Sequence, residues 1–79
     1  MSQGDSALRF NAEQFAVDIR VWMAVHRHGV RATAAAVPSG AAQISRLQRG
    51  MCEPHAGLFL ALCDLMGLDP MAYYVKATP

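Results

Sequence analysis

The residues best suited to chemistry in this chain are arginines in a segment that contains no acid. Between Ile19 and Cys52 there is no Asp or Glu, and the strong bases of this segment are Arg20, Arg27, Arg31, Arg46 and Arg49. The net charge of the whole chain is only +1, because all six acids lie outside the segment. A guanidinium group pairs in bidentate fashion with a phosphate or with the edge of guanine. Solvated surfaces usually mix both charges, so the segment favours an anionic partner over solubility alone.

Two other kinds of chemistry find less support in the sequence. His26, His28, His55 and Cys52 are potential zinc ligands, but their spacing matches no known zinc pattern, so we expect no metal and no cofactor. The serine, histidine and aspartate residues of a hydrolase are present in the composition, but no local motif arranges them. We therefore expect a binding protein with no catalytic residues, not an enzyme.

Length and composition indicate one small folded domain. The chain has 79 residues, of which 53% are hydrophobic and 16% charged, which is too apolar for a disordered tail. No apolar run approaches the roughly 20 residues that span a bilayer, and no signal-peptide pattern is present. We expect a cytoplasmic protein with no membrane contact and with reduced cysteines, Cys63 lying in the core.

The first part of the chain divides into an arm and a helix. Residues 1–10 lack sustained periodicity and are expected to form a flexible arm, with residues 11–79 as a single folded domain. Asn11 is a suitable N-cap for a helix that Gly29 would end. One apolar face of this helix holds Phe15, Ile19, Trp22 and Met23, with Val25 or His26 continuing it.

Two short helices are predicted in the middle of the chain. The alanine-rich residues 30–37 favour a helix, and Pro38 to Gly40 stop it. A second helix follows over 41–49, with Ile44 and Leu47 facing inward.

The last part of the chain predicts two more helices. One runs from Pro54 through Met66 and is closed by Gly67, and a short fifth helix begins at Asp69 and Pro70. The former carries two apolar stripes, Phe59, Leu62, Cys63 and Met66 on one and Leu58, Ala61 and Leu65 on the other. No segment reads as a convincing strand, so the fold class is all-α with five helices.

The run VRATAAAVPSGAAQISRLQRG (Val30–Gly50), followed by Pro54 and LFLALCDLMGL (Leu58–Leu68), resembles the lambda-repressor and Cro type of helix-turn-helix family, often called XRE-like. Ala34 matches the small residue of that family's second helix, and Ile44 with Ser45 matches the aliphatic residue and serine of its third. The resemblance implies a compact five-helix domain with a helix-turn-helix at about residues 30–49. Pro38 stands where the family usually has glycine.

The resemblance also implies a site. The groove-facing positions of the family fall on Ala41, Ala42 and Arg46, and a backbone-contacting position falls on Arg49. From their polar side chains, Gln43 and Ser45 join the expected base readout, and Arg46 on guanine would discriminate by about 1–3 kcal/mol. Near the helix ends, Arg27 and Arg31 join Arg49 as expected phosphate contacts.

The function expected from these features is regulation of transcription by binding double-stranded DNA, most simply as a small repressor. A homodimer on a palindromic operator would double the few base contacts of one module. The expected dimer surface consists of Leu58, Leu65, Met71, Tyr73 and Tyr74. Two alternatives remain open: a protein-interaction module, such as an antitoxin or polymerase-binding factor, and DNA packing without sequence preference.

Overall fold

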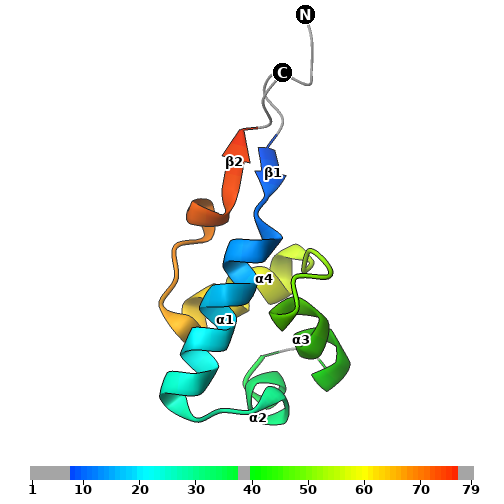
Figure 1. The fold of residues 1–79 in the computed structure, drawn as a ribbon, viewed down its shortest axis with the longest axis vertical. Coiled ribbons are helices and arrows are strands. Elements are labelled where there is room, and N and C mark those ends of the chain that lie inside the picture. The colour runs from blue at the N-terminus through cyan, green and yellow to red at the C-terminus, as the bar shows by residue number, and fades with distance from the viewer. Residues whose placement is uncertain (1–7, 38–39, 77–79) are drawn as a thin grey trace, which may run out of the picture.

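The computed structural model describes residues 8–37 and 40–76. In chain order its elements are β1 (Leu8–Phe10), α1 (Ala12–His26), α2 (Val30–Ala35), α3 (Ala41–Gln48), α4 (Ala56–Met66), the 3-10 helix η2 (Pro70–Tyr73) and β2 (Tyr74–Lys76). Helix α1 lies over α4, α2 and α3 lie together at one end, and the two strands project at the other (Figure 1). The molecule is therefore elongated, with principal extents of 47 × 21 × 20 Å.

Helix α1 begins as the sequence predicts and ends earlier than expected. The Asn11 side chain accepts a hydrogen bond of 3.1 Å from the Gln14 backbone N–H, which confirms it as the N-cap. At the other end Arg27, with φ of 56°, adopts the left-handed conformation that usually favours glycine. Gly29 instead precedes α2 as its N-cap. The predicted continuation of the core face was wrong, because Val25 and His26 are exposed.

Helices α2 and α3 pack against each other as a helix-turn-helix pair. The buried side chains of α2, Thr33 and Ala34, are small and permit this close approach. The Thr33 hydroxyl donates a hydrogen bond of 2.9 Å to the Gly29 carbonyl, which satisfies this polar group in its buried position. Helix α3 follows Gly40 and buries Ile44 and Leu47, as predicted. The predicted turn residues Pro38 and Ser39 lie outside the described residues.

Helix α4 starts two residues later than predicted. His55, not Pro54, precedes it, and the His55 Nδ1 accepts a hydrogen bond of 3.1 Å from the Leu58 backbone N–H. Gly67 closes the helix with φ of 69°, as predicted. Histidine is an unusual N-cap, which is why the sequence did not reveal it.

The predicted fifth helix was wrong. Asp69 does cap a helical segment, since its Oδ1 accepts a hydrogen bond of 3.1 Å from the Met71 N–H, but that segment is a single 3-10 turn. Residues Tyr74–Lys76 then form β2, which pairs antiparallel with β1 in the register Leu8 with Lys76, Arg9 with Val75 and Phe10 with Tyr74. The expected flexible arm therefore ends in a paired strand, while residues 1–7 lie outside the described residues. The pairing joins segments more than 60 residues apart, so no local pattern announces it.

Aromatic rings fill the space where the strands meet the helices. Phe15 and Phe59 lie at the centre, with ring centroids 5.1 Å apart, and both contact Tyr73. Phe10 and Tyr74 close the cluster from the strand side. The T-shaped geometry that prevails among these pairs is the arrangement that aromatic quadrupoles prefer. We call the rings of Phe10, Phe15, Phe59, Tyr73 and Tyr74 the aromatic cluster.

Across residues 8–37 and 40–76, none of the helices combines the length and the apolar character needed to cross a membrane.

Candidate DNA interface

Helix α3 has two faces. Its buried face, Ile44 and Leu47, fixes it on α1 and α2, while Ala42, Arg46 and Arg49 are exposed on the other. The remaining residues expected to read bases, Ala41, Gln43 and Ser45, are half-buried. The helix therefore presents its two arginines and a small apolar residue to solvent, the composition that a reading helix needs.

The end of α3 is fixed by its own backbone. Gly50, with φ of 70°, donates its N–H to the Leu47 carbonyl at 3.0 Å, and the Met51 N–H donates to the Arg46 carbonyl at 3.1 Å. These two bonds form a Schellman motif, which confirms Gly50 as the glycine that ends the helix. A Cβ on Gly50 would lie 3.7 Å from the Cβ of Ala16, so the motif also packs against α1.

Arg20 is a positioning residue that sequence reasoning did not single out. Its Nη1 donates a hydrogen bond of 2.5 Å to the Gln48 carbonyl, joining α1 to the last turn of α3. A cation at a helix C-terminus also interacts favourably with the helix dipole. One base of the acid-free segment thus holds α3 in place. Arg20 and Gln48 are 28 residues apart, so no local pattern in the sequence signals this bond.

The side chains of the expected readout residues differ in their local contacts. The Gln43 Nε2 lies 3.9 Å from the Cys52 sulfur, a weak contact that turns the amide toward the connection between α3 and α4. The Arg49 Nε, at the end of α3, donates a hydrogen bond of 3.3 Å to the Ser45 carbonyl one turn earlier. Within the described part of the chain, the Arg46 guanidinium makes neither a hydrogen bond nor an ion pair. Arg46 is thus the α3 side chain best placed to pair with an external group.

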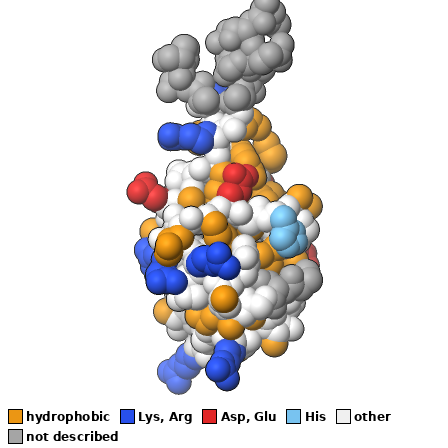
Figure 2. Space-filling view, turned by 90° about the vertical axis from the view of Figure 1, so that its right-hand side faces the viewer, with side chains coloured by type: hydrophobic (Ala, Val, Ile, Leu, Met, Phe, Trp, Pro, Cys, Tyr) orange, Lys and Arg blue, Asp and Glu red, His pale blue; other side chains and the backbone are white. Residues whose placement is uncertain are grey.

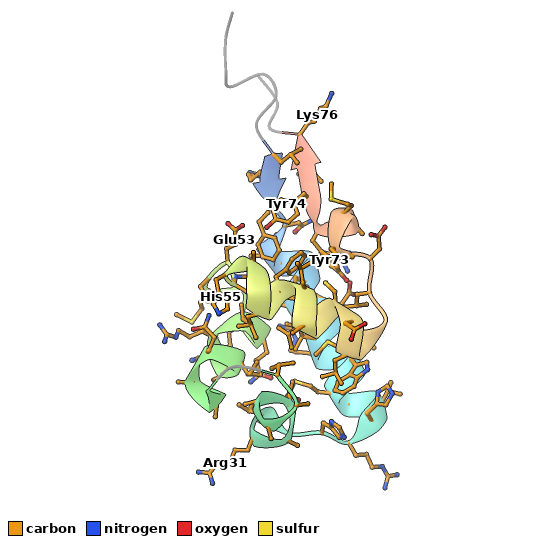
Figure 3. The ribbon with its side chains drawn as sticks, turned by 180° about the vertical axis from the view of Figure 1, so that it is seen from behind. Arg31, Glu53, His55, Tyr73, Tyr74 and Lys76 are labelled. Atoms are coloured by element: carbon orange, nitrogen blue, oxygen red, sulfur yellow. The ribbon has the colours of Figure 1, made fainter. Side chains whose placement is uncertain are left out.

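Arg27 and Arg31, the other expected phosphate contacts, are both exposed around the start of α2. Arg31 points away from the body of the molecule, at the end opposite Lys76 (Figure 3). On the face turned toward the viewer in Figure 2, several separate basic side chains lie in the lower half among hydrophobic and uncharged surface, with acidic side chains above them and a further basic side chain higher still. The structure thus gathers the bases of the acid-free segment around α2 and α3.

The expected dimer residues do not share one surface. Leu58 is fully buried and Tyr73 is 3% exposed, so the prediction that these two residues contribute to a dimer surface was wrong. Both side chains point inward because α4 and η2 close over α1. Leu65 and Tyr74 are half-buried, and Met71 is 63% exposed.

Two tyrosines tie the C-terminal segment to the helices through carboxylates. The Tyr73 hydroxyl donates a hydrogen bond of 2.5 Å to the Asp18 carboxylate of α1. The Tyr74 hydroxyl donates a hydrogen bond of 2.8 Å to the Glu53 carboxylate, and the two side chains lie side by side in Figure 3. Burial and then the bond to Asp18 raise the pKa of Tyr73 well above its usual range. The bond to Glu53 is the main cause that raises the pKa of Tyr74. Both phenols therefore stay protonated and act as donors.

The histidines and cysteines have separate surroundings. His26 stacks on Trp22 with ring centroids 4.4 Å apart, His28 meets the same ring edge-on, and His55 caps α4. Trp22, expected in the core, is half-buried at its edge. Cys63 is buried as predicted, and burial raises the pKa of its thiol to about 11.

Comparison with known proteins places the fold. The chain is similar to the crystal structure of the clp gene regulator ClgR from C. glutamicum, with a TM-score of 0.65 and 22% sequence identity over 82% of this chain and 84% of that one. No model of a known protein family matches the sequence, and neither does any curated protein. The likeness establishes a shared fold: a small, mostly helical domain with the helix-turn-helix pair α2 and α3.

Proposed function

We propose that this protein is a sequence-specific DNA-binding regulator of transcription that inserts α3 into the major groove. The observation that carries the proposal is the outer face of α3, where Arg46, exposed and without a partner among residues 8–37 and 40–76, projects from a helix anchored by Ile44 and Leu47. A helix held in this way fits the major groove, and an unpaired arginine can pair with the guanine edge. The structural neighbour is itself a gene regulator, which supports the same function.

The roles of the other residues follow from their positions. Ala41 and Ala42 allow α3 to approach the base pairs closely and can lie against thymine methyl groups, while Gln43 and Ser45 assist the readout. Arg27, Arg31 and Arg49 contact phosphates on either side of the groove, which positions the helix without reading sequence.

The finer proposal is a small repressor of the XRE-like type that acts in the cytoplasm. Because one module reads few base pairs, we propose that it binds a palindromic operator as a homodimer. It acts by binding alone, without a catalytic step or a cofactor.

The deciding experiment is a gel shift at 150 mM salt that compares genomic fragments with random DNA of equal length. The protein should select particular fragments, and Arg46→Ala should lower affinity for those fragments about 5- to 150-fold, which corresponds to 1–3 kcal/mol, with a much smaller effect on random DNA. Arg9→Ala is the matched control, since Arg9 is an exposed arginine on β1, far from α3. Equal losses of affinity for genomic and random DNA would show that Arg46 contacts only phosphate. A protein that binds neither DNA would refute the proposal.

Salt dependence separates the phosphate contacts from the base contacts. Each phosphate neutralised adds about 0.9 to the slope of log affinity against log salt concentration. Arg49→Ala should therefore weaken binding to all DNA and flatten that slope by about one unit. An unchanged slope would show that Arg49 does not contact a phosphate.

The alternative of a protein-interaction module loses part of its basis. It relied on a surface of Leu58, Leu65 and Tyr74, and the burial of Leu58 removes that residue from any surface. An exposed apolar face does exist on α1, where Val17, Val21 and Val25 are exposed.

A further inference from the structure

We propose that the outer face of α1 binds a second copy of this chain, with the two α1 helices antiparallel. Val17, Val21 and Val25 are 41%, 56% and 71% exposed and follow one another at four-residue spacing. That spacing places them on one side of the helix, opposite the side that buries Phe15 and Ile19. We call the three exposed residues the valine stripe. Valine is a poor helix former, so its repeated use on a solvent-facing side indicates a contact surface rather than a preference for helix.

The surface beside the valine stripe is hollowed. A shallow hollow is lined by side chains of α1 and by Leu68 after α4; the α1 residues are Asp18, Val21, Trp22, Val25 and His26. The half-buried indole of Trp22 forms part of its wall. A ridge of aliphatic side chains from another helix would fit into such a hollow and cover the valines.

The charges along α1 indicate what that other helix is. Within α1 the acids Glu13 and Asp18 lie in the first half, whereas Arg20 and His26 lie in the second half and Arg27 follows the helix. Asp18 already accepts bonds from Gln14 and Tyr73, and Arg20 donates to Gln48 of α3. Glu13 and Arg27 therefore carry the charge pattern that a partner helix would meet. A second α1 placed antiparallel, with Val21 near the twofold axis, brings each Glu13 toward the Arg27 of the other copy. A parallel arrangement would align like charges instead. The stripe is therefore complementary to itself, the property that a twofold interface requires.

The proposed interface leaves Arg46 and the outer face of α3 open to DNA, and in the dimer it assigns Arg27 to Glu13 of the other copy instead of to a phosphate. Helix α3 packs on the side of α1 that carries Ala16 and Arg20. The stripe meets the end of α3 only at Val17, which lines a surface hollow together with Arg49 and Gly50. Both copies could then present α3 to the same duplex. The dimer surface proposed here rests on the proposed function, because a dimer serves to place two copies of α3 on one operator. The test of the dimer uses no DNA, so the dimer and the DNA-binding function can fail independently.

The first test is sedimentation velocity of the full chain over micromolar to millimolar concentrations, without DNA. The wild type should dimerise, and Val21→Glu should raise the dimer dissociation constant about a hundredfold or more, because it places two facing carboxylates in an apolar contact. Leu60→Glu is the matched control, since Leu60 is 55% exposed on α4, outside the stripe. A wild type that stays monomeric, or a Val21→Glu chain that dimerises normally, would overturn the proposal.

Charge reversal tests the antiparallel arrangement. Glu13→Arg and Arg27→Glu should each weaken the dimer by placing like charges together, and the double variant should recover the affinity of the wild type. Failure of the double variant to recover would overturn the antiparallel pairing.

A crosslinking experiment guards against variants that do not fold. Val21→Cys should form a disulfide-linked dimer on mild oxidation, since the two sulfurs lie close to the twofold axis, whereas Leu60→Cys should not. Equal crosslinking of the two variants would overturn the proposal. A monomeric chain that still selects genomic DNA would leave the proposed function standing and assign the stripe to a different protein.

Discussion

The two ends of this molecule use their polar side chains in opposite ways. At the end formed by the aromatic cluster, the Tyr73 and Tyr74 hydroxyls are bonded to carboxylates that lie far away in sequence. At the end formed by α2 and α3, Arg31 and Arg46 project into solvent. Polar groups that are satisfied internally stabilise a fold, while those left unpaired are available for a ligand. The contrast suggests that stability resides at the aromatic end and binding at the basic end.

The largest expected effect is loss of a ring from the aromatic cluster. Phe59 is 4% exposed and contacts four other rings of the cluster. Phe59→Ala should lower the free energy of unfolding by about 3–5 kcal/mol, a large share for so small a domain. Urea denaturation measures the loss, with Leu60→Ala on the exposed side of α4 as control. A Phe59→Ala chain as stable as the wild type would place the stability elsewhere.

The next effect is a loss of stability in alkali that originates at Cys63. Burial, with the charge of Asp69 adding to it, raises the pKa of the Cys63 thiol from 9.0 to about 11. From pH 9 upward the unfolded chain releases a proton that the folded chain retains, so the free energy of unfolding falls as pH rises. The fall attributable to Cys63 should reach about 2–3 kcal/mol near pH 11.

Denaturation curves at pH 8 and pH 10.5 measure this fall. Cys63→Ala should be less stable at pH 8, because of the cavity it creates, and should lose less stability than the wild type between the two pH values. Tyr73, whose pKa is also raised, contributes to the fall in both chains, and slightly less in Cys63→Ala because the Cys63 thiolate is one of the charges that raise the Tyr73 pKa. Identical pH dependence in both chains would contradict the prediction.

A smaller effect distinguishes arginines within the basic end itself. Arg20→Ala removes the bond to the Gln48 carbonyl and should lower the free energy of unfolding by about 1 kcal/mol, whereas Arg46→Ala should change it by less than about 0.5 kcal/mol. Both variants should weaken DNA binding. Thermal unfolding beside the gel shift separates the two roles, and equal stabilities of the two variants would show that Arg20 does not position α3.

The smallest effect has the opposite sign. Arg27 pays a conformational cost at φ of 56°, which glycine would avoid, so Arg27→Gly should raise the free energy of unfolding by up to about 1 kcal/mol. If Arg27 contacts phosphate, the same variant should bind DNA less tightly. A variant that is more stable and binds DNA as tightly as the wild type would show that Arg27 does not contact DNA.

The sequence by itself determined the helices and their ends wherever the signal is local. Asn11, Gly50 and Gly67 act through bonds to residues within a few positions, and the burial of Ile44 and Leu47 follows from helical periodicity. The exposure of Ala42, Arg46 and Arg49 was predictable for the same reason, whereas Ala41, Gln43 and Ser45, also expected to face outward, are half-buried.

Tertiary structure alone decided the features that join distant segments. The strand pairing of residues 8–10 with 74–76, the bond from Arg20 to α3 and the burial of Leu58 and Tyr73 all depend on neighbours far along the chain. The exposure of the valine stripe could not be predicted from the sequence either, because an apolar residue on a helix is expected in the core until the packing partners of that helix are known. Local chemistry fixes where a helix begins and ends, but which of its faces is covered depends on how the whole chain packs.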